Sequence, residues 1–381
     1  MIAPAATQPE VHRFTSPVAA VQGRHVRLEE SYFYPTGGGQ PADRGRVDDI
    51  RVVDVTAEDA AIVHELAEAP TFEPGDVVAG KIDTTFRRFT ARAHTASHVV
   101  YGAARRHCAD LGYAGFDISD ERVRIDLETS STLDIDRLAA IATAANTVVW
   151  EDRTVTWEQM PAAAAREDAS IAFNVKTEEG VFDEGGPVRI VRIDDWDAAA
   201  CGGTHVRSTA TIGPIMLQDV SNPGAGITRI EFTVGPPAIA RIVDGWATRR
   251  RLSQVLDAPI DGLFDAAETL RTAHEERTAA HAALAAQTAR LRLQSLSRSP
   301  DTGWAVGLVD GVPADGIESV LREDTFADIA VVLPGDRLRL MITAGTDHDA
   351  AVLIDRVTDA LGGGGGGSAD FAQAGGIDAD S

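Results

Sequence analysis

Cysteine, lysine and long apolar runs are scarce in this chain of 381 residues. The two cysteines, Cys108 and Cys201, cannot build a disulfide framework, so we expect a free thiol or a metal ligand at each. No run approaches the roughly 20 apolar residues that a membrane-spanning helix needs, and no membrane partner is expected. The first fifteen residues lack the basic start and apolar stretch of a secretory signal. We therefore expect a cytoplasmic protein.

The scarcity of lysine bears on the charge of the chain. Lys81 and Lys176 are its two lysines, so arginine supplies nearly all of the positive charge. Acidic residues outnumber basic ones by 58 to 35, and the formal net charge of −23 argues by itself against a nucleic-acid partner. Acidic residues and alanine are spread along the whole chain, which resembles the composition of salt-in halophiles such as haloarchaea. The Debye length is about 3 Å in molar salt, so the negative charge would repel a nucleic acid only over very short distances. The charge therefore indicates the salt concentration of the protein's surroundings more than the kind of ligand it binds.

Four segments of different pattern predict an α+β protein of several domains. Residues 1–88 contain short alternating runs broken by Gly, Pro and Asp, such as Val47–Thr56, and are expected to form a small β-barrel. Residues 89–238 mix strands and helices as an α+β domain does. Residues 239–298 predict a helical arm, and residues 299–381 a glycine-rich α/β domain.

Regular patterns locate several elements. From Asp83, the expected N-cap, apolar residues recur at steps of three and four and predict a long amphipathic helix. Two further helices are expected near Leu133–Val148 and Glu158–Arg166. Strands are expected at Arg122–Leu127, Pro187–Ile193, Gly213–Asp219, Thr228–Val234, Trp304–Val309, Ile329–Leu333 and Leu338–Ile342, with a last helix near His348–Leu361.

The arm carries leucines on a seven-residue grid: Leu263, Leu270, Leu284 and Leu291, with Arg277 in the missing position. An extended arm and a helix packed on its own domain explain this grid equally well, since Ala, His and Thr fill the positions between. Further on, the six glycines of Gly362–Gly367 are typical of a linker or a disordered end. The apolar and polar mixture that follows them does not look like a tail.

Two short motifs predict a metal site. In the first, His94 and His98 are four residues apart on the predicted helix, so both imidazoles lie on one face. In the second, Gly-Gly between Cys201 and His205 lets the backbone turn tightly and aim both side chains at one point. A histidine pair alone is weak evidence, but glycines beside a cysteine are hard to explain as core packing. Three imidazoles and one thiolate suit Zn²⁺ better than Mg²⁺ or Ca²⁺.

A third motif contains three successive glycines, Gly37, Gly38 and Gly39. Their backbone amides can face an anionic or carbonyl ligand, with Thr36 and Gln40 as polar side chains beside them. The motif lacks the Lys-Ser/Thr ending of a Walker loop, which argues against a nucleotide triphosphatase.

Together and in this order, FYPTGGGQPADRG, HTASH and CGGTH resemble the alanyl-tRNA editing family, AlaX, and the editing domain of alanyl-tRNA synthetase. The resemblance extends through Ile212–Gly213 and Thr228–Gly235. Leu361–Gly376 is similar to the glycine-rich end of the synthetase's DHH-associated domain. No class II aminoacylation core or ATP site is recognisable upstream of residue 30.

The resemblance implies a trans-editing hydrolase that cleaves the ester of alanine tRNA mischarged with serine or glycine, with Zn²⁺ as cofactor. It implies three sets of site residues: catalytic Thr36, Gly38 and Gln40; substrate-binding Gly37, Gly39, Asp43 and Arg229; and metal-binding His94, His98, Cys201 and His205. The arm and residues 299–381 are expected to hold the tRNA, with a homodimer through the arm as the alternative.

Three alternatives stay open at this point. If the metal keeps four protein ligands it positions the substrate, whereas with three His205 stands back and acts through water. Editing domains of threonyl-tRNA synthetase share the HxxxH and CxxxH motifs, so the tRNA could belong to the threonine branch. The third interpretation is a non-catalytic tRNA-binding protein with structural zinc.

Overall fold

The computed structural model describes residues 2–58, 61–168, 170–171, 187–224, 226–323 and 326–377. The chain divides into two compact units, Met1–Thr248 and Arg249–Ser381. No helix among these described residues is long and apolar enough to cross a membrane.

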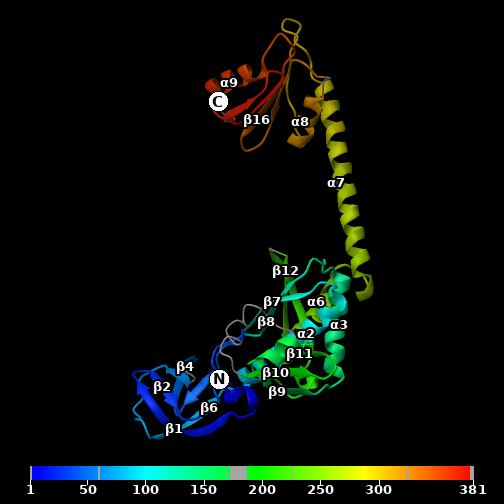
Figure 1. Ribbon diagram of the computed structural model, residues 1–381. Helices are drawn as coiled ribbons and strands as arrows, with labels where there is room; N and C mark the ends of the chain where they lie inside the picture. The colour runs from blue at the N-terminus through cyan, green and yellow to red at the C-terminus, as the bar shows by residue number, and fades with distance from the viewer. Residues whose placement is uncertain are drawn as a thin grey trace. The chain divides into compact units, whose positions relative to one another are not determined.

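The first unit begins with a closed six-stranded barrel in the order β1-β2-β5-β4-β3-β6, which follows the short helix α1 (Pro4–Thr7) (Figure 1). Every strand pair is antiparallel. Alternate residues point inward, where Phe33, Val47 and Leu66 are completely buried. The predicted barrel is thereby confirmed. Its strands are β1 (Arg13–Gln22), β2 (His25–Leu28), β3 (Gly45–Val47), β4 (Ile50–Glu58), β5 (Ala61–Leu66) and β6 (Val77–Ile82).

The predicted long helix follows the barrel as α2 (Thr84–His107). It begins where expected, because the Asp83 side chain accepts hydrogen bonds from the first free backbone N–H groups. Helix α2 packs beside α3 (Ile135–Trp150), another predicted helix, and both cover one face of a four-stranded sheet. The sheet has the order β12-β13-β8-β7, from β7 (Gly112–Ser119), β8 (Arg122–Glu128), β12 (Ile215–Gly224) and β13 (Ile227–Val234).

A smaller sheet, in the order β11-β10-β9, completes this part of the unit. Here the helix predicted near Glu158–Arg166 is wrong in its first half. Glu158 lies in β9 (Val155–Pro161), opposite Ile190 of β10 (Pro187–Ile193), and helix α4 (Ala162–Glu167) begins only after Pro161. Pairing with β10 outweighs the weak helix propensity of this segment. The third strand, β11 (Asp197–Ala200), leads to Cys201, and the 3₁₀ turn η1 (Thr209–Ile212) leads to β12.

Helix α6 (Pro236–Val255), the turn η2 (Ile260–Gly262) and helix α7 (Leu263–Gln294) form the predicted helical arm. Three of the four leucines of the seven-residue grid do not pack on their own domain, since Leu270, Leu284 and Leu291 are 60–62% exposed. A different face of α7, near the C-terminal end of the helix, is buried and carries Ala285, Ala289 and Leu293. The approach to helix α8 (Ala314–Arg322) is close: a Cβ on Gly316 would come 2.9 Å from the Cβ of Ala285.

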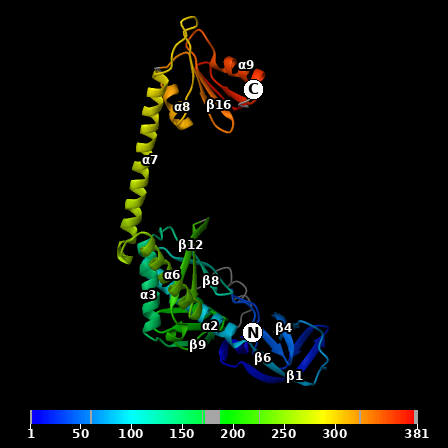
Figure 2. The same cartoon turned by 180° about the vertical axis from the view of Figure 1, so that it is seen from behind.

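The second unit contains a five-stranded sheet with helices on both faces, as Figures 1 and 2 show from opposite sides. Helix α7 and α8 (Ala314–Arg322) pack on one face, and α9 (Ala350–Leu361) on the other. The glycine run is not a linker: Gly364–Gly367 form strand β17, where a Cβ on Gly365 or Gly367 would collide with the neighbouring strand. The sheet order is β14 (Ala305–Leu308), β15 (Ile329–Leu333), β16 (Leu338–Thr343), β18 (Phe371–Ile377) and β17.

Candidate metal centre

The four predicted metal ligands meet in the first unit, and their ligand atoms all lie within 4.8 Å of one another. His94 and His98 come from one face of α2, as their spacing predicts, and Cys201 and His205 from the loop after β11. The Cys201 Sγ lies 3.1 Å from Nε2 of His94 and 3.2 Å from Nε2 of His205.

Each of the three imidazoles uses Nδ1 for a contact outside this group. The partners are Gln40 Oε1 for His94 (2.9 Å), Asp197 Oδ2 for His98 (2.9 Å) and Thr95 Oγ1 for His205 (3.1 Å). The Thr95 hydroxyl donates to Ala91 O, so it accepts from His205. With the protons on Nδ1, each imidazole presents Nε2 as its metal-binding atom, which is the usual arrangement around a metal-binding histidine.

The electrostatics also suit a metal. Burial would raise the pKa of the Cys201 thiol, but the adjacent His94 and His205 lower that pKa well below its ordinary value, so Cys201 is a thiolate. Burial lowers the pKa of His205 to about 3, despite the thiolate, and keeps this imidazole neutral. Thiolate and neutral imidazole are the forms that bind metals. This donor set, one sulfur and three nitrogens, fits Zn²⁺.

His98 differs from the other two histidines. Burial would lower its pKa, but hydrogen bonds with Asp197 and Cys201 raise the pKa to about 10. Its Nε2 therefore carries a proton that a metal ion has to displace, and metal binding at this site releases a proton.

Close packing shapes the loop that carries Cys201. A Cβ on Gly203 would overlap the His94 ring, whereas a Cβ on Gly202 would meet no atom within 4 Å. The buried Arg189 of β10 holds the loop from behind: its Nη1 donates to the carbonyls of Cys201 and Gly203, both at 2.9 Å. Its Nη2 donates to Ala6 O at 2.8 Å. The close approach of Gly203 explains why a side chain is absent at that position.

Gln40 joins the glycine-rich loop to both halves of the site. Its Oε1 accepts from His94 Nδ1 and from the backbone N–H of Thr204 (3.0 Å), and its Nε2 donates to the Thr204 hydroxyl (3.0 Å). The side chain is buried. The geometry thus makes Gln40 a residue that orients His94, while the predicted catalytic role of Gln40 stays a prediction.

The glycines before Gln40 are only partly engaged. The Gly37 amide donates to the Gln40 carbonyl, and those of Gly38 and Gly39 make no hydrogen bond within the described residues. Gly39 lies so close to Phe116 that a Cβ would collide with its backbone and ring. Thr36 is exposed, and its hydroxyl accepts from the Ala42 N–H (3.0 Å). The substrate and catalytic roles of these residues stay predictions.

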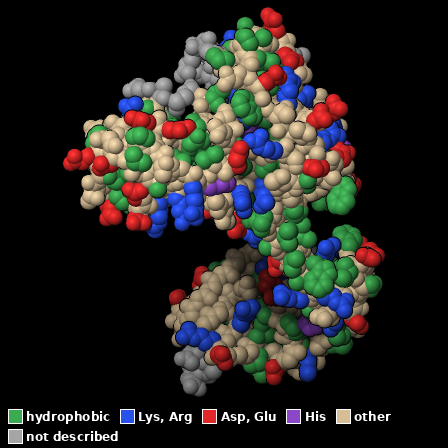
Figure 3. Space-filling view, turned by 90° about the horizontal axis from the view of Figure 1, so that it is seen from below, with side chains coloured by type: hydrophobic (Ala, Val, Ile, Leu, Met, Phe, Trp, Pro, Cys, Tyr) green, Lys and Arg blue, Asp and Glu red, His purple; other side chains and the backbone are tan. Residues whose placement is uncertain are grey.

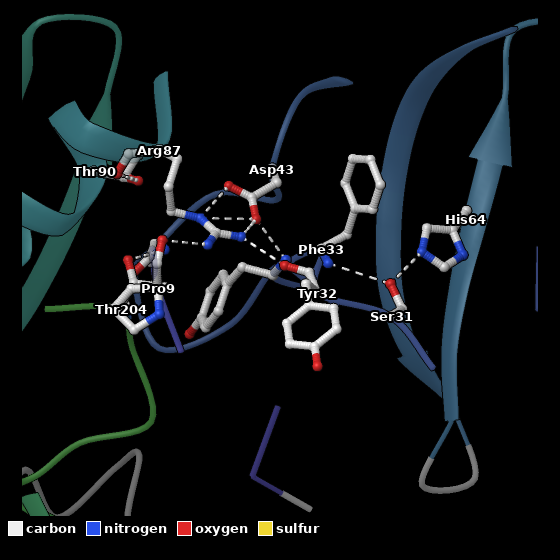
Figure 4. A network of polar contacts seen from close by, with 11 residues as sticks. Pro9, Ser31, Tyr32, Phe33, Asp43, His64, Arg87, Thr90 and Thr204 are labelled. Carbon is white, nitrogen blue, oxygen red and sulfur yellow. Dashed lines mark hydrogen bonds and ion pairs between the residues drawn. The ribbon is translucent and has the colours of Figure 1, made fainter. Parts of the chain in front are cut away.

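Asp43 closes the same loop through a buried ion pair with Arg87 of α2, each side chain 1% exposed (Figure 4). The Asp43 carboxylate also accepts from Tyr34 N (2.6 Å), and Arg87 Nη2 donates to Tyr32 O (2.7 Å). Both oxygens of Asp43 are occupied, which gives it a positioning role in the structure. Its substrate-binding role stays a prediction.

Arg229, the other predicted substrate ligand, lies on β13 and pairs with Asp126 on β8 at 2.8 and 3.0 Å. Among the described contacts of Arg229, none is with the four metal ligands. Its substrate-binding role also stays a prediction.

Sequence reasoning missed the residues that support the ligands: Thr95, Asp197, Thr204, Arg189 and Arg87. Three of them had a local signal: Thr95 lies between the two histidines, Thr204 directly before His205, and Asp197 four residues before the cysteine. Arg189 and Arg87 are recognisable only from the fold, because their contacts are with residues far away in the sequence.

Comparison with known proteins agrees with this geometry. Residues 188–231 match the threonyl and alanyl tRNA synthetase second additional domain. This domain includes β10, β11 and the loop with Cys201 and His205. It defines the class of the site.

The chain is also similar to alanine–tRNA ligases over nearly its whole length. It is 32% identical to that of Methanothrix thermoacetophila over 387 aligned positions, covering 97% of this chain and 42% of the relative. It is 30% identical to that of Pyrococcus abyssi over 375 positions, covering 96% and 41%. The chain spans about two fifths of the length of these relatives. The chain is therefore similar to part of alanyl-tRNA synthetase, which confirms the resemblance seen in the motifs.

Proposed function

We propose that this protein hydrolyses the ester bond of alanine tRNA mischarged with serine or glycine, as a trans-editing deacylase with Zn²⁺ as cofactor. The observation that carries the proposal is the convergence of one thiolate and three Nε2 atoms next to the glycine-rich loop. Kinship with alanine–tRNA ligases supports alanine tRNA as the partner.

The residues divide the work as follows. His94, His98, Cys201 and His205 would hold the ion, which would polarise the ester carbonyl; with His205 standing back, the ion would also lower the pKa of a bound water to about 7. Gln40, Asp197 and Thr95 fix the orientation of the imidazoles. Because the Gln40 oxygen already accepts two hydrogen bonds, the Gly38 and Gly39 amides and the Thr36 hydroxyl are the groups of the loop left to bind the substrate.

Deacylation assays in molar potassium chloride test this proposal. Alanine tRNA charged with serine or glycine should be hydrolysed much faster than alanine tRNA charged with alanine. It should also be hydrolysed faster than threonine tRNA charged with serine. Cys201→Ala should lose both bound zinc, measured by elemental analysis, and hydrolysis. Reversed tRNA preference would assign the protein to the threonine branch, and tight tRNA binding without hydrolysis would make it a binding protein.

A second proposal concerns the arm: α7 joins two copies of the chain into a homodimer. Leu270, Leu284 and Leu291 are spaced by multiples of seven, so they lie on one face of α7, and each is more than half exposed. Light scattering should give a dimer for the native chain and a monomer for Leu270→Glu/Leu284→Glu. A monomeric native chain would contradict this arrangement.

A further inference from the structure

Four cations form one row across the outside of the barrel. Arg13 on β1 lies directly opposite Lys81 on β6, and Lys81 opposite Arg46 on β3. Arg46 in turn lies opposite Arg51 on β4. The four strands are consecutive neighbours in the closed barrel.

The row faces solvent. All four side chains are exposed, while residues next to them along the strands, such as Val47, Val52 and Ile82, are buried inside the barrel. Neighbouring strands are about 4.8 Å apart, so the row places four positive charges over about 14 Å.

Within the described part of the chain, no carboxylate neutralises the row. None of the four cations forms an ion pair there, and Arg46 donates to the backbone carbonyl of Asp49. Some other arginines of this unit do form ion pairs: Arg24 with Glu65, Arg122 with Glu231, Arg192 with Glu158 and Arg207 with Glu10.

Such a row is unfavourable for the isolated protein, because like charges directly opposite each other destabilise a sheet. It also runs against the composition, since acidic residues exceed basic ones by 23 and red side chains are spread over the visible surface (Figure 3). A ligand with a line of negative charges would offset the repulsion between the four cations.

We propose that Arg13, Lys81, Arg46 and Arg51 bind consecutive phosphates of an RNA backbone; that the RNA is the tRNA substrate rests on the function proposed above. The position of the row suits this role. Lys81 lies three residues before α2, and His94 is ten residues along that helix, so the two are at most about 25 Å apart. One RNA molecule can reach both.

The test compares two full-length variants of equal charge. The first replaces the row: Arg13→Gln, Lys81→Gln, Arg46→Gln and Arg51→Gln. The control replaces the four paired arginines: Arg24→Gln, Arg122→Gln, Arg192→Gln and Arg207→Gln. Fluorescence anisotropy with labelled alanine tRNA gives the Kd at several salt concentrations, and circular dichroism checks folding.

Because each phosphate contact contributes about 0.7 to 0.9 to the slope of log Kd against log salt, the row variant should lose about three from that slope. The control should keep the slope, and both variants should keep kcat at saturating substrate.

An unchanged slope in the row variant, or equal losses in both variants, would overturn the proposal while leaving hydrolysis by the native chain untouched. If the native chain hydrolyses nothing but its RNA binding still depends on the row, the proposed function fails and the row stands. Row-dependent binding to phosphatidylserine vesicles, with no binding to tRNA, would assign the row to a membrane surface and overturn the RNA assignment.

Discussion

The carboxylate of Asp197 lies 2.9 Å from Nδ1 of His98, and its side chain is 1% exposed. The other two histidines are held by neutral groups, the Gln40 amide oxygen and the Thr95 hydroxyl. His98 is therefore the one histidine ligand whose Nδ1 proton is held by a carboxylate, which increases the basicity of its Nε2.

Asp197→Asn should weaken zinc binding by about 10- to 100-fold, because the amide removes that charge and accepts a weaker hydrogen bond from His98. Competition with a chromophoric chelator measures the affinity. Asp194→Asn is the matched control, since Asp194 is exposed three residues earlier and the same charge is lost. Equal affinities for Asp197→Asn and the native chain would show that the carboxylate does not tune the ligand.

Gly203→Ala and Gly202→Ala form a second matched pair. The new methyl group at 203 would overlap the His94 ring, so that variant should lose most of its bound zinc. At 202 the methyl group would meet no atom within 4 Å, and zinc content should stay near one per chain. Elemental analysis after dialysis measures both. A full zinc content in Gly203→Ala would mean that the loop relaxes at little cost.

The buried pair of Asp43 and Arg87 predicts a large stability effect. Asp43→Asn leaves the Arg87 guanidinium buried without its counter-charge, which should cost about 3 to 5 kcal/mol in the free energy of unfolding. The double variant Asp43→Leu/Arg87→Met should be much less destabilised, since it buries no charge. Denaturant titration in molar salt compares the three chains. A double variant as unstable as Asp43→Asn would contradict the role of the uncompensated charge.

The predicted metal site came from spacing alone, because His94 and His98 are local to one helix and the glycines beside Cys201 permit a tight turn. The contacts of the supporting residues could not be predicted in this way. Gln40 contacts His94 across 54 positions of sequence and Arg189 contacts Ala6 across 183, so only the packing of barrel, helix and sheet brings them together.

The misplaced elements have a similar origin. Segment 158–161 became a strand because β10 was there to pair with it, and the glycine run became an edge strand because β18 lies beside it. In both cases a partner distant in sequence decided the conformation, and local propensity did not.

Thr36 offers a test of substrate discrimination. Thr36→Val keeps the shape but removes the exposed hydroxyl, which can hydrogen-bond the hydroxyl of a bound serine and finds no partner on alanine. The kcat/KM for alanine tRNA charged with serine, divided by the kcat/KM for alanine tRNA charged with alanine, should fall. Thr36→Ser, which keeps the hydroxyl, should preserve the ratio. If Thr36→Val and the native chain discriminate equally between the two substrates, this hydroxyl does not recognise the serine side chain.

His64 predicts how barrel stability depends on pH. It is completely buried, with Nε2 2.8 Å from the Ser31 hydroxyl and Nδ1 3.0 Å from Val26 O. Burial, only partly offset by the hydrogen bond with Val26, lowers its pKa from 6.5 to about 4. Above pH 6.5 the imidazole is neutral in both folded and unfolded chains, so its contribution to stability is complete. As the pH falls from 6.5 to 4, His64 becomes protonated in the unfolded chain but stays largely neutral in the folded chain. About 3 kcal/mol of stability is lost over this interval.

Because carboxylates also titrate in this range, the informative quantity is the difference between the native chain and His64→Gln. The free energy of unfolding of the native chain should fall more steeply between pH 6.5 and 4 than that of His64→Gln, by about 3 kcal/mol over the interval. NMR titration of the His64 Cε1 proton should give a midpoint near pH 4 in the folded protein. Parallel stability curves, or a midpoint near 6.5, would show that the barrel accommodates the charged imidazole.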